Sequence, residues 1–375
     1  MTNRTVHPAL RTRPLASALL LTFLLAACEI RPGGAKQDSA TAPGVAPAGV
    51  GTDSVSGVPA VPPDSSWRAG AADTGTMQLA PASPRRGGVI FAHVEGIAAD
   101  ARCTWKGAPL PCHRRPGGGV IALIPLPADE PAGTYSFTVE HPGGRIARQL
   151  TVGDRQFGRE LVMLNRDLYA LVSRTADVAR DARALRGVLG TESAERRWSG
   201  DWRDPIAGAS RESGYGTERF YVQASDSSRA VTLEPSLTTR GAFAADTSTG
   251  APSGGVPSWR HAGVDVAARR GASVAAPAAG SVVDVGEYAL TGRTLVLDHG
   301  QGVLSAYFHL DTVLVRRGDQ VARGKSVARV GSTGLSTGPH LHYGVYIHGK
   351  DVDPAAWHAM PAWLKADSVR ATAAR

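Results

Sequence analysis

The fold of the C-terminal part of this chain is decided by two short stretches, Arg-His-Ala-Gly-Val-Asp at residues 260–265 and Gly-Pro-His-Leu-His-Tyr-Gly-Val at residues 338–345. In an extended chain, side chains two residues apart point to the same side. His340 and His342 are therefore expected to share one face of a strand. His261 and Asp265 are four residues apart, which also places them on one face if that segment is extended.

These residue types suit a metal ion. Zinc binds imidazole nitrogen and carboxylate oxygen at about 2 Å in a tetrahedral arrangement, and a catalytic zinc leaves its fourth position open. His261, Asp265 and one of His340 and His342 would supply three ligands. The segment Tyr-Phe-His-Leu at residues 307–310 adds His309. Two histidines would then remain for acid–base chemistry.

The order of these blocks resembles the lysostaphin/LytM-type zinc metallopeptidases, which cut peptide bonds in bacterial peptidoglycan. Their pattern is His-x-x-x-Asp, a lone histidine in Tyr-x-His-Leu, and His-x-His after a glycine-rich turn. The sequence between these motifs also matches the family pattern, in the blocks 276–283, 298–300, 318–321 and 331–339. Several ordered blocks over about 100 residues are a far more specific indication than one short motif.

The resemblance implies a role for each of five residues. His261, Asp265 and His342 would bind one zinc ion, whereas His309 and His340 would be catalytic, one as a base and one as a donor to the oxyanion. Of the eleven histidines, seven lie between His261 and His358. The other three in that range are expected to be structural; they are His299, His348 and His358.

Two function classes follow from the resemblance. The first is an active zinc endopeptidase that cuts peptide cross-links of peptidoglycan, with the D-alanyl–diaminopimelate bond as the expected target. The alternative is a non-catalytic LytM-type activator of cell-wall amidases. Such activators lack one or more of the five residues, and this chain keeps all five. Glycan cleavage normally needs two carboxylates, and the constellation has only Asp265. The hairpin at 315–325 resembles biotinyl carrier domains, but Lys325 lacks their presenting turn, so we interpret it as shared architecture.

The composition is basic, which suits an anionic surface. The formal net charge is +8 and the isoelectric point about 9.7, which suits the bacterial envelope. Nucleic acid is not expected as a partner, because no basic helix or zinc-finger spacing accompanies the charge. A length of 375 residues predicts two or three domains.

The N-terminal end indicates export and lipidation. Residues 1–27 are predicted to be a lipoprotein signal peptide, because an arginine-containing head precedes a short apolar run that ends in Leu-Ala-Ala-Cys. The end of this run resembles the bacterial lipoprotein cleavage box, and the resemblance implies that Cys28 carries the lipid that anchors the protein to the membrane. Glu29 rather than aspartate follows it, which favours the periplasmic face of the outer membrane. Residues 28–85 are predicted to be a disordered tether.

The rest of the chain divides into four predicted parts, which give a mainly β protein. Residues 86–153 are expected to form a small immunoglobulin-like β domain with a Cys103–Cys112 disulfide, and this domain could bind a divisome or wall-synthesis partner. Residues 154–197 are predicted to be a helical connector, 198–358 the peptidase domain and 359–375 a C-terminal tail. Residues 222–258 are an insertion that could border the site. No asparagine follows Asn165 to block the metal.

Overall fold

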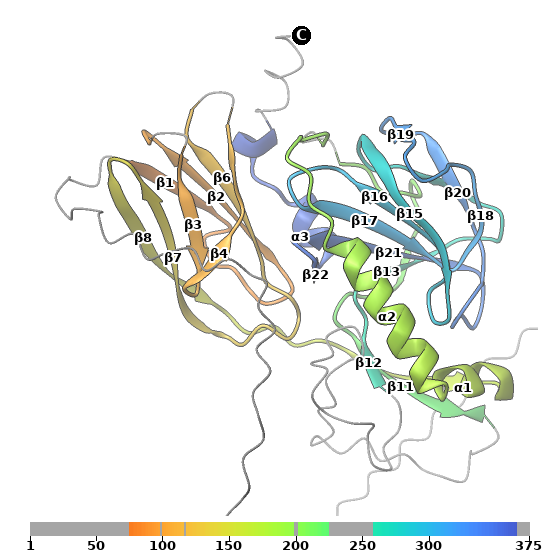
Figure 1. Cartoon of the computed structure of the whole chain (residues 1–375). Coiled ribbons are helices and arrows are strands. Elements are labelled where there is room, and N and C mark those ends of the chain that lie inside the picture. The colour runs from red at the N-terminus through yellow and green to blue at the C-terminus, as the bar shows by residue number, and fades with distance from the viewer. Residues whose placement is uncertain (1–74, 98–99, 116–117, 199–201, 225–257, 366–375) are drawn as a thin grey trace, which may run out of the picture. The chain divides into compact units, whose positions relative to one another are not determined.

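A computed structural model describes residues 75–97, 100–115, 118–198, 202–224 and 258–365 (Figure 1). The predicted signal peptide, Cys28, the tether up to residue 74 and most of the insertion, residues 225–257, lie outside the described residues. Within the described part, no helix is long and apolar enough to cross a membrane.

The described elements alternate little between helix and strand, and strands dominate. In the N-terminal part the strands are β1 (Thr76–Ala80), β2 (Val89–Glu95), β3 (Arg102–Trp105), β4 (Ala108–Leu110), β5 (Cys112–Arg114), β6 (Val120–Pro125), β7 (Gly133–His141) and β8 (Gly144–Val152). A connecting part follows with β9 (Arg159–Leu164), α1 (Arg166–Val172), α2 (Thr175–Leu189), β10 (Arg211–Ser213) and β11 (Glu218–Gln223). The C-terminal part contains β12 (Ser258–Arg260), β13 (Val264–Ala267), β14 (Ser273–Ala275), β15 (Gly280–Tyr288), β16 (Gly292–Asp298), β17 (Val303–Phe308), β18 (Leu310–Val313), β19 (Gln320–Val321), β20 (Ser326–Val330), β21 (His340–Ile347), β22 (Lys350–Val352) and α3 (Pro354–His358).

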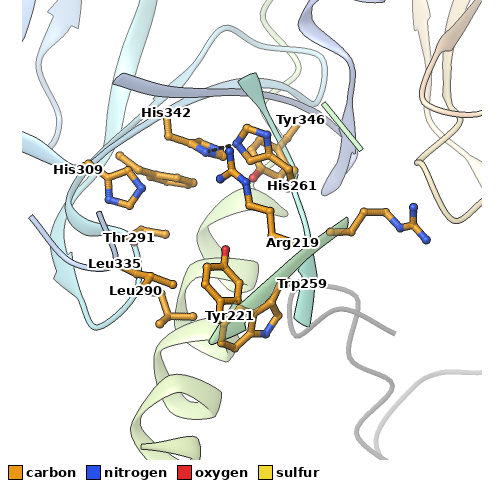
Figure 2. Close-up of a pocket in the computed structure, with 13 residues that line it drawn as sticks. Arg219, Tyr221, Trp259, His261, Leu290, Thr291, His309, Leu335, His342 and Tyr346 are labelled. Atoms are coloured by element: carbon orange, nitrogen blue, oxygen red, sulfur yellow. Dashed lines mark hydrogen bonds between the residues drawn. The ribbon is translucent and has the colours of Figure 1, made fainter. Parts of the chain in front are cut away.

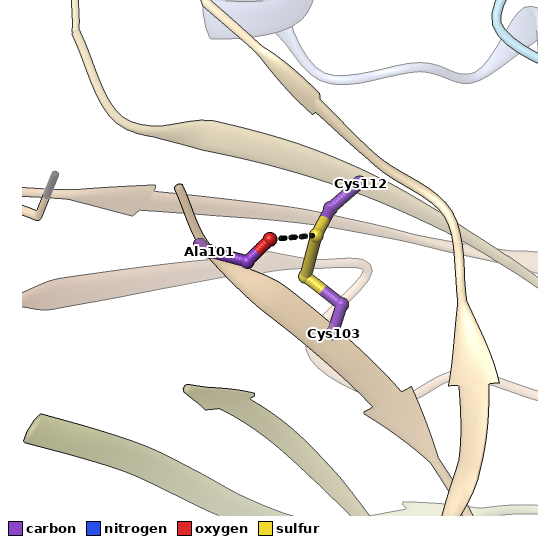
Figure 3. Close-up of a disulfide and its surroundings, with 3 residues drawn as sticks. All are labelled: Ala101, Cys103 and Cys112. Atoms are coloured by element: carbon purple, nitrogen blue, oxygen red, sulfur yellow. Dashed lines mark hydrogen bonds between the residues drawn. A yellow bond between two sulfur atoms is a disulfide. The ribbon is translucent and has the colours of Figure 1, made fainter. Parts of the chain in front are cut away.

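The N-terminal domain consists of two antiparallel sheets with the strand orders β1-β2-β6-β5 and β4-β3-β7-β8. Apolar residues of both sheets, such as Ile124 and Phe137, form one buried cluster. Cys103 on β3 and Cys112 on β5 are joined by a disulfide, which therefore links the two sheets (Figure 3). Because β1 begins at Thr76, the domain starts inside the range that was predicted to be tether.

The connector is not helical throughout. Residues 159–164 form the strand β9, which pairs in parallel with β11 along its whole length. Leu161 and Leu164 occur at helical spacing, but Leu164 is buried and Leu161 is 45% exposed. Pairing with a distant strand overrides a local periodicity of this kind. Two helices, α1 and α2, do lie in this range, and α1 begins after a cap formed by Asn165.

The C-terminal domain contains a large antiparallel sheet with the order β10-β13-β21-β17-β16-β15-β19, to which β22 is added beside β21. A second sheet has the order β14-β20-β18. Successive side chains along β21 point to opposite faces of the large sheet. Leu341, Tyr343 and Val345 point into the core shared with the small sheet. Tyr346 faces the opposite side, where α2 packs across the large sheet (Figure 1).

The end of this domain lies beyond the predicted boundary at residue 358. Trp357, Met360 and Leu364 are all buried in one apolar cluster with residues of the C-terminal domain such as Leu341. At least residues 359–364 of the predicted tail therefore belong to the fold, because removing them would expose apolar side chains to water.

His299 is one of the most deeply buried polar residues of this core. Its Nδ1 donates to the carbonyl of Ala279 at 2.8 Å, and its Nε2 accepts from the Ser305 hydroxyl at 2.7 Å. Burial lowers the pKa of His299 to about 4. The imidazole is therefore neutral in the folded protein at neutral pH, in keeping with the structural role expected for it.

We predict that His299 makes stability depend on pH. The pKa is about 4 when folded and near 6.5 when unfolded, so the unfolded chain binds more protons between these values. The free energy of unfolding should therefore fall as pH is lowered from about 6.5 to 4, by up to roughly 3 kcal/mol from this residue. Urea unfolding of the wild type and His299→Gln at several pH values measures this. Equal pH slopes in the two proteins would contradict it.

Candidate metal and catalytic site

Strand register brings the first two site residues together. Asp265 on β13 lies directly opposite His342 on β21, and Phe308 on β17 lies opposite His342 on its other side. Residues that face each other across neighbouring strands point to the same side of the sheet. Asp265 and His342 therefore project together from the face of the large sheet that lies opposite the core shared with the small sheet.

His261 reaches the same point from the segment before β13. Its Nε2 lies 3.0 Å from Asp265 Oδ1 and 2.9 Å from His342 Nδ1, and these last two atoms are 3.3 Å apart. The ligands of a tetrahedral zinc with bonds of about 2 Å are separated by about 3.3 Å. In the described part of the chain, no other three histidine, cysteine or acidic side chains converge in this way.

The protonation of these residues fits a cation. His261 Nδ1 donates to the carbonyl of Gly214 at 2.9 Å, which leaves a lone pair on Nε2. Burial would raise the pKa of Asp265, but the neighbouring imidazoles of His261 and His342 hold it well below its usual range. Burial lowers the pKa of His342 to about 4. The cluster thus offers one carboxylate oxygen and two imidazole nitrogens, the donor set that zinc prefers.

His309 and His340 lie beside this cluster. Their ring centroids are 4.9 Å apart, and His340 Nε2 is 3.7 Å from Asp265 Oδ1. His309 follows β17 with a left-handed backbone (φ 59°), which is uncommon outside glycine and occurs often at functional sites. Burial, together with the nearby charges of His340 and His342, lowers the pKa of His309 to about 3.

Backbone carbonyls fix the orientation of both rings. His309 Nδ1 donates to the carbonyl of Thr333 at 2.8 Å, and His340 Nδ1 donates to that of Gly338 at 2.8 Å. With the proton held on Nδ1, each ring keeps an unprotonated Nε2 that can accept a proton. The structure thus brings all five predicted site residues together, although they come from three separate segments.

A pocket opens at this cluster and contains residues to which no role was assigned from the sequence (Figure 2). Tyr221 and Trp259 form an aromatic wall with ring centroids 4.8 Å apart. The hydroxyl end of Tyr221 points toward Arg219, which lies next to His261 in the view (Figure 2). Burial raises the pKa of Tyr221 to about 12, so its hydroxyl remains a donor. The only sequence indication was the turn at 214–219, which ends in Arg219.

The three histidines that were expected to be structural lie outside the pocket. His299 is in the core described above. His348 Nδ1 contacts Glu192 Oε1 at 2.6 Å, and His358 Nδ1 lies 3.5 Å from Asp204 Oδ1. None of the three lines the pocket.

Comparison with known proteins agrees with this geometry. Residues 259–354 match the family model of peptidase family M23. This part of the chain is an M23 domain. The chain is similar to the peptidoglycan DD-endopeptidase ShyB of Vibrio cholerae, with 40% identity over 93 residues, which are 25% of this chain and 22% of the relative. It is also similar to the murein hydrolase activator NlpD of Salmonella dublin, with 34% identity over 139 residues, 32% of this chain and 36% of the relative.

The fold likeness extends beyond the M23 domain. A solved structure from Pseudomonas aeruginosa, described as a peptidase M23, is 24% identical and has a TM-score of 0.50. The alignment covers 74% of this chain and 95% of that one, and it supports the fold alone. Since the matched part of this chain spans only 22% and 36% of the two curated relatives, their whole-protein activities do not transfer directly.

Gly263 should be essential for the metal site because nothing larger fits there. A Cβ at this position would lie 2.5 Å from both His342 Nε2 and the carbonyl oxygen of Tyr343. Gly263→Ala must therefore shift β21 and its histidine, and we expect zinc affinity to fall by about tenfold or more. Competition with a chromogenic chelator measures the affinity.

Gly338→Ala is the matched control for this prediction. Gly338 also lies beside the site, but a Cβ there would meet nothing within 4 Å. Zinc affinity should therefore stay close to that of the wild type. Equal affinities for Gly263→Ala and Gly338→Ala would contradict the steric argument.

Proposed function

We propose that this chain is a zinc-dependent endopeptidase that hydrolyses peptide cross-links of peptidoglycan. The observation that supports this most strongly is the convergence of three metal-ligand atoms with two further imidazoles. His261 Nε2, Asp265 Oδ1 and His342 Nδ1 lie within 3.3 Å of one another. His309 and His340 stand beside them with their Nδ1 protons already donated.

In this proposal the five residues divide into two roles. His261, Asp265 and His342 hold the zinc, which when bound polarises a carbonyl and activates water. His309 and His340 act through Nε2: one takes a proton from the attacking water, and the other, once protonated, donates to the oxyanion. Preorganised donors of this kind are worth several kcal/mol in the transition state. Thr333 and Gly338 keep the two rings in place through their carbonyls.

The proposed substrate is a peptide bond, and the direct D-alanyl–diaminopimelate cross-link is our first choice. A polarised acyl carbon suits a metal and two imidazoles, whereas glycan cleavage normally needs a second carboxylate. The similarity to ShyB supports a DD-endopeptidase, since that protein is named as one. The aromatic wall of Tyr221 and Trp259 borders the pocket into which such a substrate would fit.

The proposed location is the cell envelope. The sequence around Cys28 supports a lipid anchor, and the names of the relatives refer to peptidoglycan and murein. In our proposal the anchor holds the enzyme on the periplasmic face of the outer membrane. The N-terminal β domain would then be free to bind a divisome or wall-synthesis partner.

A non-catalytic activator of amidases is the second candidate. The observation that favours it is the similarity to NlpD, which is named a murein hydrolase activator. The retention of His309 and His340 beside a full ligand set favours the endopeptidase instead. An activator needs neither a metal nor aligned imidazoles, so nothing would maintain this geometry.

Metal binding and catalysis should separate by mutation. His261→Ala, Asp265→Ala and His342→Ala each remove a ligand, and we expect them to lose both zinc and activity. His309→Ala and His340→Ala should keep zinc and lose about 10²–10⁴-fold in rate. Zinc per chain, measured by mass spectrometry beside the rate, tests this. Full zinc occupancy in His261→Ala would refute the ligand assignment.

Digestion of purified sacculi tests the substrate. The zinc-loaded protein should convert cross-linked muropeptide dimers to monomers, as seen by chromatography, and a chelator should stop it. New reducing ends with dimers unchanged would indicate glycan cleavage and overturn the proposal. The same digest with an added amidase identifies the second candidate: dimers would persist, and amidase products would rise only when this chain is present, even in His309→Ala.

A further inference from the structure

The second oxygen of Asp265 has a partner of its own. Oδ1 faces His261 and His342, whereas Oδ2 accepts a hydrogen bond from Arg219 Nη2 at 2.5 Å. The side chains are largely buried, with 15% of Arg219 and 9% of Asp265 exposed. A buried ion pair with good geometry holds both partners firmly, because losing either one leaves an uncompensated charge.

Arg219 is itself held from the other side. Its Nε donates to Glu160 Oε2 at 3.0 Å. Glu160 lies on β9 exactly opposite Arg219 on β11 in the parallel ladder, and Ser213 donates to the same carboxylate oxygen at 3.3 Å. The planar guanidinium is thus fixed at two edges, a geometry that a lysine ammonium cannot reproduce. Arg219 and Glu160 both precede the residues that match the M23 family model.

We propose that Arg219 is a positioning residue that restricts Asp265 to bind the metal through one oxygen, and that Glu160 holds Arg219 in place. A carboxylate with two free oxygens can bind a metal in a bidentate manner, which raises the coordination number and suits manganese. With Oδ2 occupied by Arg219, Asp265 offers only Oδ1. The site then favours four-coordinate zinc over ions that take more oxygen ligands.

The ratio of two affinities isolates this effect. Replacing the guanidinium has two effects on the absolute metal affinity. It removes a positive charge that repels any divalent cation, and it also changes the ligand geometry by releasing Asp265 Oδ2. Zn²⁺ and Mn²⁺ carry the same charge, and the lost repulsion acts on both alike. The Zn²⁺/Mn²⁺ affinity ratio therefore reports the ligand geometry rather than the charge.

The experiment compares the full wild-type chain with Arg219→Met. We expect the Zn²⁺/Mn²⁺ affinity ratio, from chelator competition, to fall about tenfold, which is the lower end for loss of a residue that orients a metal ligand. The visible absorption of the Co²⁺-loaded protein should also weaken, because Co²⁺ absorbs less as its coordination number rises above four. An unchanged ratio and spectrum in a folded Arg219→Met protein would overturn the proposal.

A matched control removes an arginine–aspartate pair away from the metal. Arg270 donates to the Asp311 carboxylate through Nε and Nη2 on the exposed surface. Arg270→Met should leave both the ratio and the Co²⁺ spectrum unchanged. If it moves them as far as Arg219→Met does, the effect is general and the proposal fails.

A second variant tests the same proposal if Arg219→Met does not fold. Glu160 is 44% exposed, so Glu160→Ala should fold, and we expect the ratio to fall a few-fold in the same direction. No change in Glu160→Ala, in the absence of a folded Arg219→Met, would reject the proposal. The inference rests on the proposed zinc site but not on hydrolysis. Failure to bind zinc at all would instead refute the proposed function.

Discussion

The antiparallel register between β13 and β21 is the constraint on which the candidate site depends. It sets Asp265 directly opposite His342, so that the two side chains leave the sheet at one place and on one face. A shift of β21 by one residue would turn His342 to the other face of the sheet, away from Asp265. The core itself prevents that shift, because Leu341 and Tyr343 fill it from the same strand.

The two faces of the large sheet therefore have different roles, one in stability and one in the candidate site. One face packs against the small sheet and contributes most of the apolar burial of the domain. The other face packs against α2 through Leu185 and Leu189, and it also carries His342, which lines the pocket. Function is possible there because the stability of the domain does not depend on filling that surface with apolar side chains.

Charge balance explains why the pocket extends beyond the M23 segment. A buried carboxylate with no counter-charge would be costly, and Arg219 supplies that charge next to Asp265. The arginine is available only because β11 pairs with both β9 and β12. The connecting part is thus more than a spacer between domains, since it provides a wall of the pocket and a partner for a candidate metal ligand.

The sequence by itself indicated the candidate metal ligands, because the spacings His-x-x-x-Asp and His-x-His limit which side chains can share a face. It also predicted the mainly β class, since alternation along a strand is a local property. The tertiary structure alone decided the rest. β9 became a strand although its leucines recur at helical spacing, and Glu160 and Arg219 met through a ladder between segments far apart in the chain. Such contacts depend on pairing partners that no local pattern specifies, and this is why the support of Asp265 could not be inferred from the sequence.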